Sequence, residues 1–160
     1  MFIIKNITPS IREKILKHIQ DNSNTVHHRD NISDTSYYTN RNDKKLGKLF
    51  EKYLEPIIYE YIRAPFKMNT IWYQVYNKKS GSFHDFHTHK SKLCQISGIF
   101  YIKLNDDSVI TEFVFGERCV TPDVSEGDIV LFDSGLEHRS PPNDSDNDKI
   151  ILSFNLDLNI

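Results

Sequence analysis

The sequence has few of the features that mark secreted, membrane or nucleic-acid-binding proteins. It contains two cysteines in 160 residues, Cys94 and Cys119, which are far apart in the chain. A small secreted domain held by disulfides normally has more, so we expect a reducing, cytoplasmic location with both cysteines in the core. The N-terminus lacks the apolar core and cleavage site of a signal peptide. No run approaches the roughly 20 apolar residues that span a bilayer, so we expect no membrane association.

Charge of one sign is not concentrated anywhere. The formal net charge is −2, the sequence pI is about 6.4, and no block of Lys and Arg occurs. Phosphate contacts need clustered cations, so nucleic acid is not expected to be the main ligand. Glycine is also scarce, whereas aromatic residues make up 12% of the chain. A chain of this length predicts one domain over residues 1–160 with a real hydrophobic core.

The N-terminal part, residues 1–66, is expected to be helical support with a long loop. A short strand is predicted at 2–5, and a helix begins at Pro9, where the missing N–H costs nothing. Residues 22–43 are polar and without period, which indicates a surface loop or a lid. That segment contains His27, His28 and Arg29. A second apolar stripe at helical spacing follows from about residue 43, and Pro56 within it predicts a kink or break.

From residue 67 onward the chain is predicted to consist of short strands. Alternating, β-branched and aromatic stretches are separated by Asn, Asp, Gly, Pro and Ser turns. This pattern is typical of an antiparallel sandwich or barrel. We therefore expect a mainly β core over residues 67–160 with the N-terminal helices packed outside it. The predicted strands are 68–76, 96–104, 109–115, 118–121, 129–132, a short one at 138, and 149–156.

The strongest chemical signal is a cluster of histidines that precedes one of these strands. His87 and His89 are two residues apart, so in an extended segment both side chains lie on one face, together with Asp85. Two such imidazoles can reach one metal ion, and His138 is the best distant candidate for a third ligand. Asp85 is an alternative to one of the histidines, and His84 is expected beside the ligands or at the surface. Three donors from one side leave the opposite side of an ion open for substrate, as in non-haem iron oxygenases.

The last predicted strand gives a second signal. Ile150, Leu152 and Phe154 form a wholly apolar face, whereas the alternate positions include Lys149 and Ser153. If the latter face points into a barrel, the lysine needs an anionic partner, because an unpaired buried charge is costly. A bound dicarboxylate would supply that partner. The other interpretation is that this face is solvated.

Several motifs in order give the chain a family resemblance. They are Trp72, His87-Thr88-His89, Ser97-Gly98-Ile99-Phe100-Tyr101, Gly127-Asp128-Ile129-Val130-Leu131-Phe132, His138, Pro142-Asn143 and Lys149 through Asn155. With them, residues of about 70–156 resemble the iron(II)- and 2-oxoglutarate-dependent oxygenases. The resemblance is greatest to the small oxygenase group of phage and bacterial genomes. It implies a double-stranded β-helix, that is, a jelly-roll or cupin-like barrel.

The resemblance also implies cofactors, activity and site residues. Fe(II) would be bound by His87, His89 and His138, and the distal carboxylate of 2-oxoglutarate would pair with Lys149. Tyr73, Tyr101 and Ser153 are further candidates to hydrogen-bond the cosubstrate. The implied activity is that of a dioxygenase, most simply a hydroxylase, acting on a small molecule or a peptide. Neither the identity of the substrate nor the oligomeric state follows from the sequence.

Two departures from the superfamily pattern keep alternatives open. The usual carboxylate of H-x-[DE] is His89 here, and the usual arginine for the cosubstrate is Lys149, a point charge without a bidentate fork. The chain also resembles a cupin, because Gly81 precedes the H-x-H at the expected spacing, although the glutamate expected after it is missing. A cupin-type metal-dependent dioxygenase or binding protein would use three histidines and no 2-oxoglutarate. A barrel without metal that binds a partner is the third class.

Overall fold

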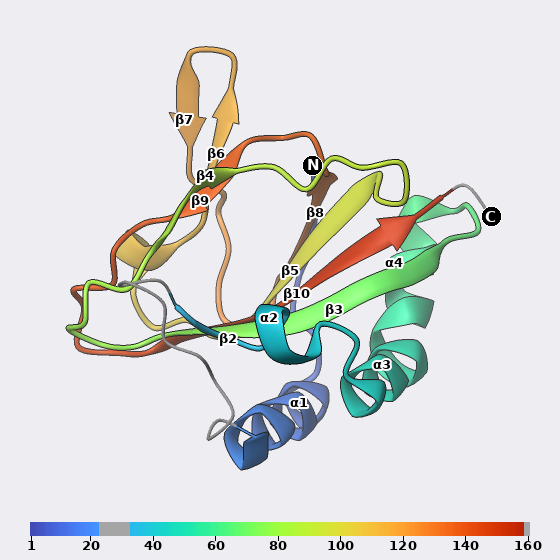
Figure 1. The fold of residues 1–160 in the computed structure, drawn as a ribbon, viewed down its shortest axis with the longest axis horizontal. Coiled ribbons are helices and arrows are strands. Elements are labelled where there is room, and N and C mark those ends of the chain that lie inside the picture. The colour runs from blue at the N-terminus through green and yellow to red at the C-terminus, as the bar shows by residue number, and fades with distance from the viewer. Residues whose placement is uncertain (23–32, 159–160) are drawn as a thin grey trace.

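The computed structural model describes residues 1–22 and 33–158, and its fold is mainly β with helices on one side (Figure 1). The helical segments are α1 (Pro9–Asn22), α2 (Tyr37–Asn40), α3 (Lys44–Leu49), the π-helical η2 (Phe50–Leu54), α4 (Glu55–Ile62) and the 3₁₀ turn η3 (Asp107–Val109). The strands are β1 (Phe2–Ile4), β2 (Asp34–Thr35), β3 (Lys67–Tyr76), β4 (His84–His87), β5 (Ile96–Lys103), β6 (Glu112–Phe115), β7 (Arg118–Val120), β8 (Ile129–Asp133), β9 (His138–Ser140) and β10 (Lys149–Asp157). Within the described part of the chain, no helix is long and apolar enough to cross a bilayer.

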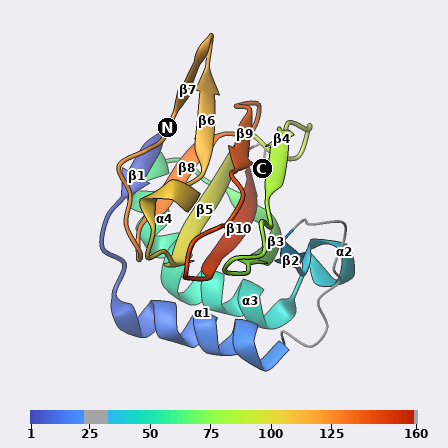
Figure 2. The same ribbon diagram turned by 90° about the vertical axis from the view of Figure 1, so that its left-hand side faces the viewer.

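The strands form two antiparallel sheets, as the sequence predicted. The larger sheet has the order β1-β8-β5-β10-β3-β2, and the smaller has the order β4-β9-β6-β7. Helices α1, α3 and α4 cover the outer face of the larger sheet, whereas the smaller sheet lies on its other side (Figures 1 and 2). The β6–β7 hairpin projects away from the body of the molecule. The inner face of the larger sheet is therefore turned toward the smaller sheet, on the side away from α1, α3 and α4.

Alternation along the central strands divides the core into two clusters. Leu152 and Phe154 of β10 lie in the cluster between the larger sheet and the helices. Ile151 of the same strand and Tyr101 of β5 lie in the cluster between the sheets. Successive side chains of a strand point to opposite faces, so one strand contributes to both clusters. The apolar face predicted for the last strand therefore packs on the helices.

The second predicted helix is interrupted where the sequence indicated. Helix α3 passes into the π-helical η2, and α4 then begins with Pro56 in its first turn. Proline has no N–H to donate to the preceding turn, so a regular helix cannot continue through it. A left-handed residue, Arg63 (φ 52°), ends α4. The chain nevertheless stays helical from Lys44 to Ile62, and Leu46 and Ile58, one from each half, both lie in the core cluster against the larger sheet.

The described part of the predicted loop 22–43 is more regular than expected. It contains β2, which pairs with the edge of β3, and the short helix α2. Thr35 Oγ1 donates to the Tyr73 carbonyl (3.1 Å), and the Tyr73 N–H donates to Ser36 Oγ (3.1 Å). Ser and Thr side chains bond backbone groups readily, which fixes a segment that has no apolar period. His27, His28 and Arg29 lie outside the described residues.

A close contact between β5 and β10 gives a prediction about stability. Gly98 pairs with Phe154, and a Cβ added at Gly98 would lie 2.1 Å from Phe154 Cζ. The ring cannot move away easily, because Phe154 is fully buried and packs edge-on against Phe50 at 5.0 Å. We expect Gly98→Ala to lower the free energy of unfolding by about 1–3 kcal/mol in urea titrations. In a double-mutant cycle with Phe154→Leu the two losses should not add, and additive losses would contradict the contact.

Candidate metal centre and the buried lysine beside it

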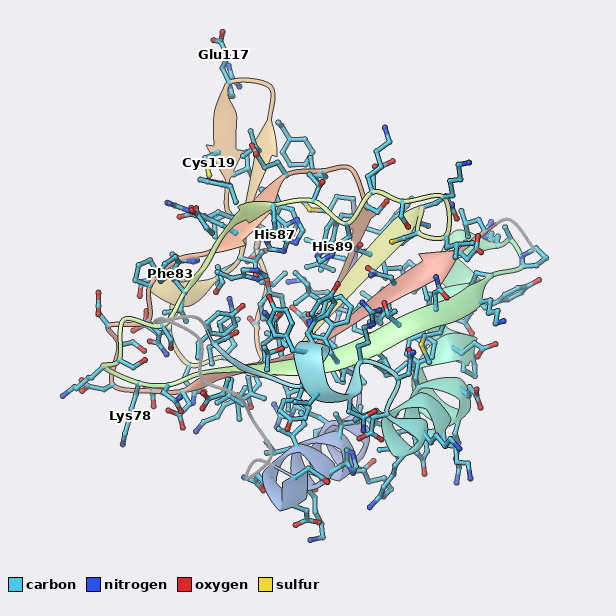
Figure 3. The ribbon with its side chains drawn as sticks, in the orientation of Figure 1. Lys78, Phe83, His87, His89, Glu117 and Cys119 are labelled. Atoms are coloured by element: carbon cyan, nitrogen blue, oxygen red, sulfur yellow. The ribbon has the colours of Figure 1, made fainter. Side chains whose placement is uncertain are left out.

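Three histidines converge in the space between the sheets. His87 ends β4 and lies opposite His138, the first residue of β9. His89 follows β4, and its backbone N–H donates to the Ser134 carbonyl (2.8 Å). One ring nitrogen of each histidine lies within 4.8 Å of the others. Figure 3 shows His87 and His89 between the sheets, in a position to share one ion with His138.

Backbone carbonyls hold two of these rings in the orientation that a metal site needs. His87 Nδ1 lies 2.7 Å from the Asp85 carbonyl oxygen, and His138 Nδ1 lies 3.0 Å from that of Leu136. A carbonyl accepts only, so Nδ1 carries the proton in both rings. Nε2 is then the unprotonated nitrogen, which is free to act as a metal ligand. Phe113 and Phe132 pack against the His138 ring and restrict its rotation.

Burial keeps these imidazoles neutral. It lowers the pKa of His138 to about 3 and that of His89 to about 4, with the charge of His87 as a smaller cause in both. Burial likewise lowers the pKa of His87 from its ordinary value. Only a neutral imidazole can ligate a metal, so the site is ready to bind at neutral pH without first releasing protons.

The lowered pKa values predict that acid destabilises the metal-free protein. An unfolded histidine has a pKa of about 6.5, so below that pH the unfolded chain binds more protons than the folded one. Stability should therefore fall as the pH drops from about 6.5 toward 4, by about 1.4 kcal/mol per pH unit for each histidine involved. Urea midpoints of chelator-treated protein at several pH values measure this slope. His138→Phe should reduce this slope by the contribution of one histidine, about 1.4 kcal/mol per pH unit. An unchanged slope would contradict the lowered pKa of His138.

The histidine segment departs from simple strand alternation. The pairing of β4 with β9 shifts register between His84 and His87, so an irregularity lies between them. As a result the His84 ring stacks on His87 at 3.9 Å, on the side where alternation had placed Asp85. Asp85 is exposed, and its carboxylate accepts from the N–H of Phe86 (2.8 Å). The expectation that Asp85 shares the face of His87 and His89 is therefore wrong, and His84 lines the cavity instead.

Lys149 is fully buried directly behind the cavity that the histidines line, since Ser140 and Thr111 of that lining are its hydrogen-bond partners. Its ammonium donates to Ser140 Oγ (2.8 Å) and Thr111 Oγ1 (3.3 Å) and lies 4.9 Å from the centre of the Tyr76 ring. No carboxylate within the described ranges forms an ion pair with it. Burial lowers the pKa of Lys149 to about 7, and the charge of Glu112 opposes the shift only in part. A cation held this way is electrostatically uncompensated and favours an anionic ligand.

The other three candidates for cosubstrate binding are placed differently from one another. Tyr101 is fully buried near Lys149, and its hydroxyl has no hydrogen-bond partner among the described residues. Ser153 lines the inner cavity and donates to Gln74 Oε1 (3.3 Å). Tyr73 lies on the other face of β3, in the helix-side cluster, and its hydroxyl donates to the Asn22 carbonyl (3.3 Å). Tyr73 therefore does not reach the cavity, because it lies between Trp72 and Gln74 in β3 and its side chain points to the opposite face of the strand.

The sequence analysis missed several residues that complete the cavity. They are Gln74 and Tyr76 of β3, Thr111 before β6, and Ser140 of β9. Gln74 and Tyr76 alternate with Trp72, and Ser140 is two residues beyond His138, so period two could have identified three of the four. Thr111 lies in a segment that had been predicted as strand from residue 109. That segment begins instead with η3, where Asp106 accepts the N–H of Ser108.

The expectation that both cysteines lie in the core is wrong for one of them. Cys94 is buried as predicted, but Cys119 is exposed on the projecting β7 (Figure 3). All of β7 is exposed because its hairpin projects from the body of the molecule, which a strand pattern alone does not reveal. Arg139 points away from the histidines, since it donates to Glu112 Oε2 (2.6 Å) and stacks over Phe86.

Comparison with known proteins shows the fold. No protein-family model matches the sequence, and no curated protein matches it. Among solved structures, the non-haem α-ketoglutarate-dependent epimerase SnoN of nogalamycin biosynthesis has a TM-score of 0.76 at 12% identity, over 96% of this chain and 76% of that one. HygX from Streptomyces hygroscopicus, with nickel and 2-oxoglutarate bound, has a TM-score of 0.74 at 10% identity, over 99% and 82%. A prolyl hydroxylase from Trichoplax adhaerens, in complex with a hypoxia inducible factor peptide, has a TM-score of 0.69 at 15% identity, over 98% and 83%. The chain therefore has the fold seen in 2-oxoglutarate- and iron-dependent oxygenases.

Proposed function

We propose that this protein is an Fe(II)- and 2-oxoglutarate-dependent dioxygenase with a double-stranded β-helix core, acting as a hydroxylase. One observation carries the proposal: the uncompensated buried lysine donates to Ser140 and Thr111, whose side chains line the same cavity as the three-histidine group. Neither feature stabilises the fold by itself. A metal ion accounts for the histidines, and a dicarboxylate accounts for the lysine.

The residues present fit both groups chemically. Imidazole nitrogen is a suitable ligand for Fe(II), and three protein ligands leave positions for other molecules. Lys149, Ser153 and the unpartnered Tyr101 hydroxyl provide a charge and hydrogen-bond donors for a carboxylate. Iron with 2-oxoglutarate supplies the oxidising chemistry when bound, and the chain supplies orientation. The metal ligands we propose are His87, His89 and His138, with Lys149 as the partner of the distal carboxylate.

The chain's own residues have distinct tasks under this proposal. The carbonyls of Asp85 and Leu136 hold the protons of His87 and His138 on Nδ1, away from the ion. Ser140 and Thr111 hold the Lys149 ammonium in place. The aromatic cluster between the sheets excludes water, so the interaction of Lys149 with a carboxylate is strengthened. The folds of the oxygenases described above support this assignment.

The test is an anaerobic titration of metal-free protein with Fe(II) and then with 2-oxoglutarate. We expect a visible charge-transfer absorbance that needs both components. Succinate, which lacks the keto acid, serves as the control and should give no band. Stoichiometric iron binding without a band would contradict the proposal.

A cupin-type metal protein without 2-oxoglutarate is the second candidate. The observation that favours it is His89, which replaces the carboxylate of the usual facial triad and makes an all-histidine set. This candidate predicts that the metal affinity is unchanged by 2-oxoglutarate and by substitution of Lys149. The same titration therefore separates the two candidates.

A further inference from the structure

The histidine site opens on one side into a second cavity with aromatic walls. Its lining residues are Thr35, Tyr37, Tyr38, Trp72, Gln74, His84, His87, Thr88 and His89. It shares Trp72, Gln74 and three of the histidines with the inner cavity. A molecule in this outer cavity would therefore lie directly beside the proposed metal.

The aromatic wall of the outer cavity is well fixed. Tyr37 meets the ring of Trp72 edge-on at 5.1 Å and that of Tyr38 at 5.2 Å. Trp72 in turn lies 5.5 Å from His89. Helix α2, which carries both tyrosines, follows the residues that bond the backbone of β3. A fixed aromatic surface favours an apolar or ring-shaped group.

Beyond His89 the cavity continues as an open groove of different character. The groove is lined by Tyr37, Arg41, Asn42, Asn69, Thr70, Thr88, His89, Lys90, Ser91, Cys94 and Asn155. Two cations lie along it and, within the described part of the chain, no carboxylate does. The protein as a whole has 22 acidic and 20 basic residues, so this separation is local. The Arg41 guanidinium lies 5.6 Å above the Tyr37 ring, which holds it at the point where the two regions meet.

We propose that the substrate is a small organic anion bound across these two regions. Its ring or hydrocarbon part packs on Tyr37 and Trp72 beside the histidines, and its carboxylate or phosphate binds Arg41 and Lys90. The orientation follows from the linings, because the aromatic region borders His84, His87 and His89 whereas the cationic groove reaches only His89. That the bound anion is a substrate to be oxidised rests on the proposed function. That an anion binds in the outer cavity and the groove does not.

The experiment compares matched probes by isothermal titration calorimetry on the full chain without added metal or 2-oxoglutarate, so that no metal ion binds the probe carboxylate and no second anion competes with it. The probes are 4-phenylbutyrate, 3-phenylpropyl phosphate and the neutral 4-phenylbutanamide. Arg41 and Lys90 are both exposed, and two exposed charge contacts together raise affinity by up to about 30-fold, so we expect at least one anion to bind about tenfold more tightly than the amide. Whichever anion binds more tightly identifies the anionic group of the substrate. In Arg41→Gln/Lys90→Gln the preference should disappear, with amide binding unchanged.

Control variants separate this inference from the proposed function. Lys92→Gln removes a neighbouring charge that does not line the groove, and the preference should persist there. Lys149→Met tests whether the probe has entered the inner cavity, and the preference should persist there too. Equal binding of anion and amide, no binding of any probe at about 10 mM, or a preference lost only in Lys149→Met would overturn the inference. None of these outcomes depends on the Fe(II) and 2-oxoglutarate titration, which tests the proposed function by itself.

Discussion

Lys149→Met is expected to weaken 2-oxoglutarate binding strongly while it makes the metal-free protein more stable. Removing one partner of a buried charge pair costs about 2–5 kcal/mol, so affinity should fall by about 30-fold to more than 1,000-fold. Without ligand the lysine ammonium contacts the hydroxyls of Ser140 and Thr111 and the Tyr76 ring, and no described carboxylate forms an ion pair with it. Methionine has similar volume and no charge, so it removes that cost of burial.

The gain in stability should depend on pH in a defined direction. The pKa of Lys149 is lowered to about 7 by burial, whereas an unfolded lysine has a pKa of about 10.4. Between these values the unfolded chain binds more protons, so the stability contributed at this position rises with pH. Lys149→Met should therefore stabilise most near pH 6.5 and least near pH 10, as measured by urea unfolding. Lys103→Met on the adjacent strand removes a partly exposed lysine and should show neither effect.

His138→Ala is expected to lose the metal. Among the described residues, the ring supplies one of three clustered ligand nitrogens. Removing even a residue that hydrogen-bonds a metal ligand typically costs about 10–100-fold in metal affinity, so losing a ligand should cost at least as much. We therefore expect iron affinity to fall by about 100-fold or more, measured by anaerobic titration against a chromophoric chelator. Stoichiometric iron in this variant would remove His138 from the ligand set.

Two controls keep this result interpretable. The His138 ring also packs against Phe113 and Phe132, so His138→Ala could lose metal because the fold is destabilised. His138→Gln fills more of the space, and the same loss of iron there would be due to the missing imidazole. His84→Gln removes a histidine that lines the same cavity but lies outside the three-histidine group. Iron affinity should change little there, and a loss as large as that of His138→Ala would place His84 among the ligands.

The periodicity of the sequence was sufficient to predict most of the fold. Strand alternation predicted that Ile150, Leu152 and Phe154 share an apolar face and that Lys149 points the other way. Pro56 predicted the break in the second helix, because a missing N–H is a local property. The same period, counted from Trp72, would have excluded Tyr73 from the cavity and included Gln74. Tyr73 was predicted as a site residue because its hydroxyl can hydrogen-bond a carboxylate, but its side chain points to the face of β3 opposite that of Trp72.

The sequence by itself determined which groups are present and on which face of a regular strand each one lies. It named His87, His89 and His138, but only the pairing of β4 with β9 brings residues about 50 apart in the chain together. The irregularity in β4 exchanged Asp85 for His84, since one extra residue reverses the alternation. The burial of Lys149, with no ion pair to a carboxylate in the described ranges, also depends on which strands close over it. Such properties arise from contacts between segments distant in sequence, and only the tertiary structure decides them.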